Sequence, residues 1–423
     1  MEDQPLKIAV VGTGVAGLTA AYLLQRRHQV TLFEKSPQVG GHTQTIVIPS
    51  GPEKWTPIDA GFTYLNDLNY PLFHRLLEKL QIPTRPSRLS FAFWDEKSGF
   101  HYALTGLNGV FAQRSNLWNA SFFGMLREKS RFKNRAAKDL FAGALEGATL
   151  GDYLIDRNFS KTFIEDYLLP LGASLWTLSV REMRDFPAAA FIHRLELNGL
   201  LGGGHKVQWQ TVAEGSHSYV RALIKAIAGR IRVKEGIEEL VRKGEQVLLR
   251  TQGGKEEPFD KVVLACHADE ALSLFPEPTE DESRLLSPWR YQKNFATLHT
   301  DTDMMPPHRR AWACWNYIRE RESTASEPLP LTCHMNAIQG LDNKDQYFVT
   351  FNRVRPIPEK YVLKEMYFTN PIFTREALST QAELPKLNGV GNTYYCGSYF
   401  GLGSHEDAVK SAVAVAQCFG MDL

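Results

Sequence analysis

Residues 8–46 constrain the possible folds of this chain more than any other segment. The apolar run from Ile8 to Val11 leads into Gly12-Thr13-Gly14-Val15-Ala16-Gly17 and then into a helical pattern. A second apolar run, Val30 to Phe33, ends at Glu34. The spacing G-x-G-x-x-G between a strand and a helix predicts a βαβ unit that binds a dinucleotide. The first glycine permits the tight turn, the second lets the backbone approach a pyrophosphate, and the third lets the helix pack closely on the strand.

Glu34 and the start of the helix complete this prediction. The first turn of the helix, at Val15 and Ala16, offers free N–H groups and a partial positive charge to phosphates. Glu34 follows Gly14 by 20 residues, the spacing at which a carboxylate accepts hydrogen bonds from ribose hydroxyls. A glycine turn without a ligand explains neither the acid nor its spacing.

The next segment indicates which dinucleotide binds. Gly40 and Gly41 predict a second close approach of the backbone to a long ligand. With His42 and Thr43 they resemble the Gly-Gly-Arg string of the flavin-containing amine oxidase and phytoene desaturase superfamily, with histidine in place of arginine. Residues 58–62 resemble its D-x-G segment, which lies against the isoalloxazine. The resemblance implies FAD and, besides the residues above, contacts from Lys35, Gly40, Gly41, His42, Thr43, Ala60, Gly61, Phe62, Ile237 and Ala265.

Composition excludes several classes of protein. The net charge of +1 over 423 residues provides no field that favours nucleic acid. The five cysteines are scattered and contain no C-x-x-C, and the acidic start at residues 1–4 is not a signal peptide, so we expect a cytoplasmic protein. The twelve histidines show no H-x-x-x-H or H-E-x-x-H spacing, which argues against a metal site.

The order of predicted elements gives a discontinuous fold. We expect an α/β chain with a Rossmann-like FAD-binding domain of the glutathione-reductase type and an inserted α+β substrate domain. The FAD-binding domain comprises residues 1–69, 207–269 and 385–423, and the substrate domain comprises 70–206 and 270–384. Within the first, strands are predicted at 231–233, 246–251, 261–265 and 393–396, and helices at 216–227 and 405–418.

A glycine-rich string before the last helix is the second strong motif. Gly397, Ser398 and the residues up to Gly403 precede a helix that starts near Glu406. In the superfamily this helix start stabilises the reduced flavin, which implies cofactor contacts by Asp407 and by the backbone amides of Ala408 and Val409. The alternative is a helix capped by Ser404 that only packs.

The string His405-Glu406-Asp407 is similar to the ending of one subgroup of amine-oxidase-like flavoproteins. The likeness extends through residues 66–93, 110–114, 167–176, 207–209, 265–268, 298–301 and 315–317. The chain departs from the subgroup at Ser404, Ala408 and Thr369-Asn370. The resemblance implies a link to enzymes that methylate or cyclopropanate fatty acyl chains, and such a methyltransferase or cyclopropane synthase as a partner.

These observations predict an FAD-dependent oxidoreductase that transfers a hydride to or from a fatty acyl chain through flavin N5. The FAD is expected to be non-covalent, because the S-G-G-C-Y attachment string is absent. The candidate catalytic residues are Tyr64, His405 and Glu406. Two alternatives stay open: an oxidase of a small amine, and a non-catalytic FAD-bound partner of a lipid-modifying enzyme. A long apolar tunnel favours the first reading, an aromatic cage the second, and a blocked cavity the third.

Residues 114–138 carry seven Lys or Arg and one acid, with aromatic residues interleaved at the start. Such a helix can lie on an anionic membrane surface, which predicts peripheral contact with the inner face of the membrane. The alternative is a solvated helix whose aromatic residues face the core.

Overall fold

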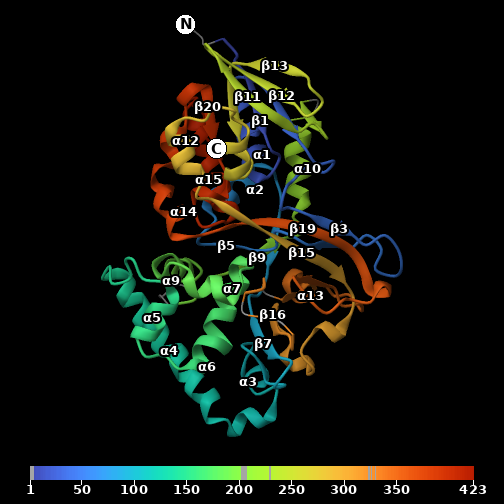
Figure 1. Cartoon of the computed structure of the whole chain (residues 1–423). Helices are drawn as coiled ribbons and strands as arrows, with labels where there is room; N and C mark the ends of the chain where they lie inside the picture. The colour runs from blue at the N-terminus through green and yellow to red at the C-terminus, as the bar shows by residue number, and fades with distance from the viewer. Residues whose placement is uncertain (1–3, 202–206, 228–229, 323, 325, 329) are drawn as a thin grey trace.

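The computed structural model describes residues 4–201, 207–227, 230–322, 324, 326–328 and 330–423. Its upper half contains a parallel five-stranded sheet (Figure 1). The strands in spatial order are β10 (Ile231–Val233), β2 (Gln29–Glu34), β1 (Lys7–Val11), β14 (Lys261–Leu264) and β20 (Thr393–Tyr395). Three distant parts of the chain therefore build one sheet.

The apolar strands at the centre of this sheet are covered by helices. Ile8 pairs with Val30 on one side and Lys261 on the other, and Ile8, Ala9 and Val10 are fully buried. The packed helices are α1 (Val15–Leu24), α2 (Pro71–Lys79), α10 (His217–Ala226) and α15 (His405–Gln417). Small sheets flank them: β11–β12–β13 (Ile237–Lys243, Gln246–Thr251, Glu256–Phe259), β3–β4 (Thr45–Val47, Pro57–Asp59) and β5–β9–β6 (Leu65–Asn66, Trp209–Val212, Thr84–Pro86).

The lower half contains a mixed seven-stranded sheet. In spatial order its strands are β19 (Val362–Ile372), β15 (Arg290–His299), β18 (Phe348–Phe351), β17 (Leu331–His334), β16 (Trp315–Arg319), β7 (Phe91–Asp95) and β8 (His101–Ala103). Only β16 and β7 pair in parallel among the described strands of this sheet. The long strands β15 and β19 run across the middle of the molecule (Figure 1).

A helical layer lies beside this sheet. Its longest member is α4 (Ala120–Phe141), which begins where the Asn119 side chain accepts the N–H of Phe122. The other members are α3 (Leu107–Val110), α5 (Leu150–Asp156), α6 (Lys161–Phe163), a π-helical turn (Ile164–Leu168), α7 (Leu169–Trp176), α8 (Val180–Asp185) and α9 (Ala188–Leu197). Shorter helices elsewhere are α11 (Ala268–Ser273), α12 (Glu280–Leu286), α13 (Met335–Gln339) and α14 (Arg375–Thr380).

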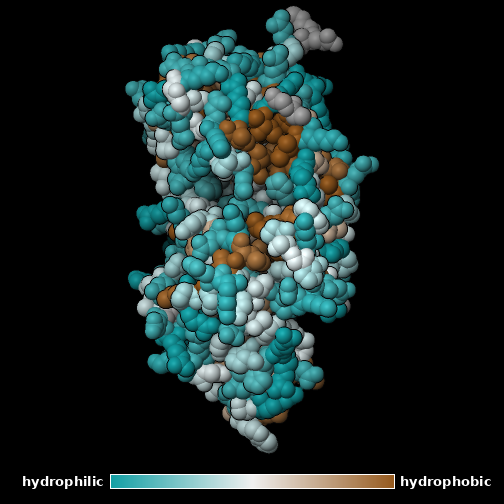
Figure 2. All heavy atoms as spheres, turned by 90° about the vertical axis from the view of Figure 1, so that its right-hand side faces the viewer, coloured by the Kyte–Doolittle hydropathy of each residue, from teal (hydrophilic) through white to brown (hydrophobic). Residues whose placement is uncertain are grey.

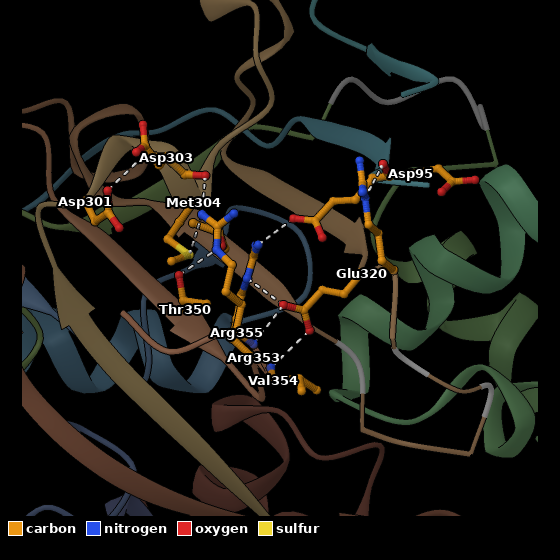
Figure 3. A network of polar contacts seen from close by, with 12 residues as sticks. Asp95, Asp301, Asp303, Met304, Glu320, Thr350, Arg353, Val354 and Arg355 are labelled. Atoms are coloured by element: carbon orange, nitrogen blue, oxygen red, sulfur yellow. Dashed lines mark hydrogen bonds and ion pairs between the residues drawn. The ribbon is translucent and has the colours of Figure 1, made fainter. Parts of the chain in front are cut away.

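A buried ionic network joins the chain after β18 to the ends of β7 and β16 (Figure 3). The guanidinium of Arg353 lies 2.7 Å from a Glu96 oxygen and 2.8 Å from a Glu320 oxygen. Glu320 also accepts the N–H groups of Val354 and Arg355. Removing one member of such a buried pair is costly, so the network fixes this end of the sheet.

The predicted fold class is confirmed: a parallel sheet of the FAD-binding type is combined with a mixed-sheet substrate domain. Predicted strand and helix positions in the first domain agree to within a residue or two. The predicted boundary between residues 206 and 207 adjoins 202–206, which lie outside the described residues. On the side shown in Figure 2, hydrophobic side chains gather mainly at the height of the five-stranded sheet, and the lower end is largely polar.

Candidate active site

A cavity of about 780 Å³ extends from the glycine loop after β1 to the helices and mixed sheet of the lower half. Its walls come from the segments 11–16, 33–35, 40–42, 61–64, 236–237, 265–267, 367–371, 397–399 and 402–405, together with Gln44, α7, α9 and β16. Both halves of the molecule therefore build one cavity. Such a cleft is the default position for a ligand.

The three glycines of the first loop have the predicted geometry. Gly12 has φ +103°, and a Cβ there would lie 2.7 Å from the Ala265 oxygen. A Cβ at Gly17 would lie 2.0 Å from the Gly12 oxygen, so the helix can pack this closely only with glycine. A Cβ at Gly14 would meet no atom within 4 Å, because it would project into the cavity. The loop therefore leaves open space where a pyrophosphate would lie.

Glu34 lies at the end of β2 and faces this loop. Its carboxylate accepts the N–H of Thr13 at 3.2 Å, the Thr13 hydroxyl at 2.5 Å and the Ser36 N–H at 2.8 Å. It lines the cavity, as does Lys35, whose ammonium pairs with Glu270. Glu34 is thus oriented by the loop and keeps a position from which it can reach a ribose.

The two segments expected near the flavin touch each other. Phe62 donates its N–H to the His42 carbonyl at 3.1 Å. A Cβ at Gly61 would lie 1.9 Å from that same carbonyl oxygen, which explains why glycine occupies the position. Gly41 has φ +57°, and a Cβ atom at this position would lie 3.0 Å from the Gly14 Cα atom. The second glycine pair thus closes onto the first glycine loop.

Asn370 is a partner of His42 across the cavity. The His42 Nε2 lies 3.1 Å from the Asn370 Oδ1, and the Asn370 amide donates to the Thr177 hydroxyl at 2.9 Å. Burial lowers the pKa of His42 to about 4, with a smaller contribution from His267. His42 is therefore neutral near pH 7, unlike an arginine side chain.

His405 lines the cavity at the start of α15 and is also neutral. Its ring stacks on Phe62 with 3.7 Å between centroids and 17° between planes. Its Nε2 lies 3.1 Å from the Thr43 hydroxyl and 3.2 Å from the Tyr219 hydroxyl. Burial lowers the pKa of His405 to about 3, and His42 adds to this shift. The His405 ring is therefore held in a fixed orientation and forms an uncharged part of the cavity wall.

Tyr64 lines the cavity between two tryptophans, Trp209 and Trp315, each 5.7 Å away between ring centroids. Its hydroxyl donates to the Arg88 carbonyl at 3.1 Å. Burial raises the pKa of Tyr64 well above its usual range, so the phenol stays protonated. Tyr64 can shape the cavity or donate a proton, but it cannot serve as a general base near pH 7.

The structure corrects the predicted placement of Glu406. Its carboxylate accepts the N–H groups of Leu72 at 3.0 Å and Phe73 at 2.9 Å, and it does not line the cavity. These are first-turn amides of α2, which have no acceptor within their own helix. Glu406 therefore caps α2 from outside, and its position gives it a structural role.

The amides of α15 that remain free to bind a ligand also differ from the predicted ones. Ala408 already donates its N–H to the Ser404 carbonyl at 3.2 Å, and Val409 is buried in the core. Asp407 forms a capping box with Ser404, accepting its N–H at 2.8 Å and its hydroxyl at 2.6 Å. Helix geometry leaves the amides of His405 and Glu406 as the first-turn donors for a ligand.

Eighteen predicted residues line the cavity: Gly12, Gly14, Val15, Ala16, Glu34, Lys35, Gly40, Gly41, His42, Gly61, Phe62, Tyr64, Ile237, Ala265, Gly397, Ser398, His405 and Ala408. Gly17, Thr43, Ala60, Glu406, Asp407 and Val409 lie behind its wall. Sequence reasoning missed Arg194 and Asn198, which also line it. Arg194 lies in the last turn of α9 and Asn198 directly follows the helix, so their i,i+4 spacing puts them on one side of its end, but nothing in the sequence shows where that side points.

A second, smaller chamber of about 160 Å³ adjoins the cavity. Leu175 and Trp315 line both. The other walls of this side chamber are Leu89, Ser90, Phe91, Leu104, Lys129, Phe132, Lys133, Tyr167, Leu168, Leu171, Leu195, Leu200 and Leu201. The side chamber is thus a neighbour of the cavity, with mostly apolar walls that come largely from the helical layer.

FAD fits the residues present. The open space at Gly14, the carboxylate of Glu34 and the uncapped first turn of α1 suit a pyrophosphate and a ribose. Among the described residues, no group of three or more His, Cys, Asp or Glu side chains could hold a metal ion. Over the same residues, no helix is long and apolar enough to cross a membrane.

Comparison with solved structures shows the same fold. A crystal structure of a conjugated-linoleic-acid (CLA)-producing fatty acid isomerase from P. acnes superposes with a TM-score of 0.67 at 15% identity, covering 99% of each chain. Cyclohexylamine oxidase from Brevibacterium oxydans IH-35A gives a TM-score of 0.69 at 13% identity, covering 98% of this chain and 100% of that one. At these identities the likeness concerns the fold.

Sequence comparison supplies the family. An L-amino-acid oxidase of Pseudechis australis is 40% identical over 78 residues, which cover 18% of this chain and 14% of that relative. The family model described as flavin containing amine oxidoreductase matches residues 15–301, more than half of the chain. The chain therefore belongs to the flavin-containing amine oxidoreductase family and is an FAD-dependent oxidoreductase.

Proposed function

We propose that this enzyme transfers a hydride between the N5 atom of a non-covalently bound FAD and a carbon of a fatty acyl chain. The side chamber carries the proposal. It shares the walls Leu175 and Trp315 with the cavity, so a chain whose reacting carbon lies in the cavity would extend between these two side chains into an apolar space. Each methylene buried there contributes about 0.8 kcal/mol.

The charges of the cavity support an apolar substrate. The carboxylates that line it within the described residues are Glu34 and Glu270, and both lie at the glycine-loop end. His42 and His405 are held neutral by burial, and Tyr64 is held protonated. These side chains suit the binding of an uncharged alkyl segment, which needs orientation beside the flavin and exclusion of water.

A small amine is the second candidate substrate, and one observation favours it. The aromatic side chains of Tyr64, Trp209, Trp315 and Tyr367 all line the cavity. Aromatic faces attract an ammonium group. Structural neighbours include both a fatty acid isomerase and amine oxidases, so the shared fold supports either substrate class.

A chain-length series tests the proposal. Straight-chain carboxylic acids and alkylamines of matched length are titrated into the FAD-loaded protein, and flavin absorbance is followed. Affinity for the acids should rise roughly fourfold per methylene until the apolar space of the side chamber and the adjoining cavity is full. Leu171→Trp, which fills the chamber, should remove this gain, and Leu68→Trp at an exposed position should keep it. Affinity independent of acid length would contradict the proposal.

We also propose that the segment 114–138 touches an anionic membrane surface. Its aromatic residues are of two kinds: Phe122 and Phe132 are buried, and Trp118 is 90% exposed. Exposed arginines at 114 and 127 supply the charge. Trp118→Ser should weaken co-sedimentation with anionic vesicles at low salt, and Trp55→Ser, at another exposed tryptophan, should not. Equal co-sedimentation of the two variants would contradict the membrane proposal and favour the alternative of a solvated helix.

A further inference from the structure

Two lysines of α4 are the cationic members of the side-chamber wall. Lys129 and Lys133 lie one helical turn apart, so they share a helix face. Ser90 and the Tyr167 hydroxyl are the other polar groups there, and leucine, phenylalanine and tryptophan side chains form the rest of the wall. The chamber thus combines an apolar interior with two positive charges.

Lys129 has no ion-pair partner among the described residues. The carboxylate of its neighbour Glu128 faces another way and accepts hydrogen bonds from Ser160 and Arg131. The Lys129 ammonium lies 5.6 Å from the centre of the Tyr167 ring. Burial, with a smaller contribution from Lys133, lowers the pKa of Lys129 to about 8. A partly buried cation in this setting is stabilised when an anion binds beside it.

We infer that Lys129, assisted by Lys133, binds the carboxylate of a free fatty acid whose chain runs through the side chamber into the cavity. This inference rests on the proposed function and narrows its substrate to the unesterified acid. An ammonium–carboxylate contact fixes one end of the chain, and Leu175 and Trp315 guide the rest toward the flavin side. Such an anchor also determines which carbon reaches the reacting position.

Arg194 is the competing cation, because it lines the main cavity. It interacts with the Tyr70 hydroxyl. Its charge therefore already has a polar neighbour. Lys129 faces an apolar chamber without a carboxylate, which favours it as the anchor.

The test compares a C18 monounsaturated fatty acid with its methyl ester and with the lysophosphatidic acid of the same chain. Binding to FAD-loaded protein is measured by tryptophan fluorescence, because Trp315 lines both cavities. Lys129→Met should weaken binding of the free acid by about tenfold to a hundredfold and leave the ester unchanged. Lys129→Arg should restore most of the affinity. Lys138→Met, which removes an exposed charge from the same helix, should have no effect.

Several results would overturn the inference. One is equal binding of acid and ester by the unmodified protein, which leaves the acyl-chain proposal standing. A loss of affinity in Arg194→Met but not in Lys129→Met would move the anchor to the main cavity. Tighter, Lys129-dependent binding of the lysophosphatidic acid would assign the site to a phosphate head group. Failure of all three ligands to bind would overturn the proposed function together with the inference.

Discussion

The Nε2 atom of His42 lies 3.1 Å from the Oδ1 atom of Asn370 and so connects two positions at which this chain departs from the proteins it resembles. The superfamily string that this segment resembles has arginine at the position of His42, and the subgroup resemblance implies histidine at the position of Asn370, which lies in β19. Asn370 also donates to the Thr177 hydroxyl at the end of α7. The two departures therefore form one contact that joins the FAD-binding half to the substrate half.

A double-mutant cycle tests whether these two residues act as a pair. His42→Phe and Asn370→Ala should each destabilise the FAD-loaded protein, and their combination should cost less than the two effects added. We expect a coupling of about 0.5–1.5 kcal/mol, the usual net contribution of one hydrogen bond. Urea denaturation of the four proteins measures it. Additive effects would show that each residue acts alone.

Gly14→Leu should abolish FAD binding and leave the protein folded. A side chain at Gly14 meets no protein atom within 4 Å, so it enters the space proposed for the pyrophosphate. Gly124→Leu is the matched control, because Gly124 in α4 also has nothing within 4 Å in its side-chain direction and φ outside the left-handed region. The bound FAD per protein and the far-ultraviolet spectrum are measured for both. Normal FAD content in Gly14→Leu would show that the pyrophosphate does not bind beside Gly14.

Glu406→Ala should lower stability and leave flavin chemistry intact. The change removes the acceptor of the Leu72 and Phe73 N–H groups, which should cost about 1–3 kcal/mol. The rate at which substrate reduces the flavin, measured without dithionite at a temperature where both proteins are folded, should stay within a factor of about two of the rate of the unmodified protein. A large loss of rate at unchanged stability would restore Glu406 as a catalytic candidate.

The buried histidine His299 should make the protein less stable in acid. Its Nδ1 accepts the Asp301 N–H and its Nε2 bonds the Thr350 hydroxyl at 2.7 Å. Burial, then Arg353, lowers the pKa of His299 to about 3. Below about pH 6.5 the unfolded chain gains a proton that the folded protein lacks, so this histidine's contribution to stability is lost as pH falls toward 3.

His299→Asn therefore should flatten the pH dependence of the unfolding free energy. The difference in slope from the unmodified protein should approach about 1.4 kcal/mol per pH unit between roughly pH 5.5 and 4. Asparagine keeps an acceptor for the Asp301 N–H and cannot titrate. Urea denaturation at a series of pH values measures the slopes. Parallel curves for the two proteins would mean that His299 is protonated in the folded state.

The sequence predicted what depends on neighbours along the chain. The glycine loop, the helix that starts at Val15 and Glu34 at the end of the next strand follow from local spacing, and the structure places them as expected. Glu406 was wrongly placed, because a helix start does not reveal which residue faces the ligand and which faces α2. Lys129 and Asn370 gain their positions only when distant elements pack together. No local pattern connects Lys129 to Trp315, although both line the side chamber.

The fatty acyl substrate is the central proposal, and one anaerobic experiment tests it most directly. Oxidised enzyme is mixed with saturated and unsaturated fatty acids or with simple amines, and photoreduced enzyme is mixed with unsaturated fatty acids. Flavin absorbance is followed, and the position of double bonds in the recovered chains is determined by mass spectrometry. We predict a change in flavin absorbance or in double-bond position with fatty acids alone. Rapid flavin reduction by amines, with no change in flavin or chain for any fatty acid, would contradict the account.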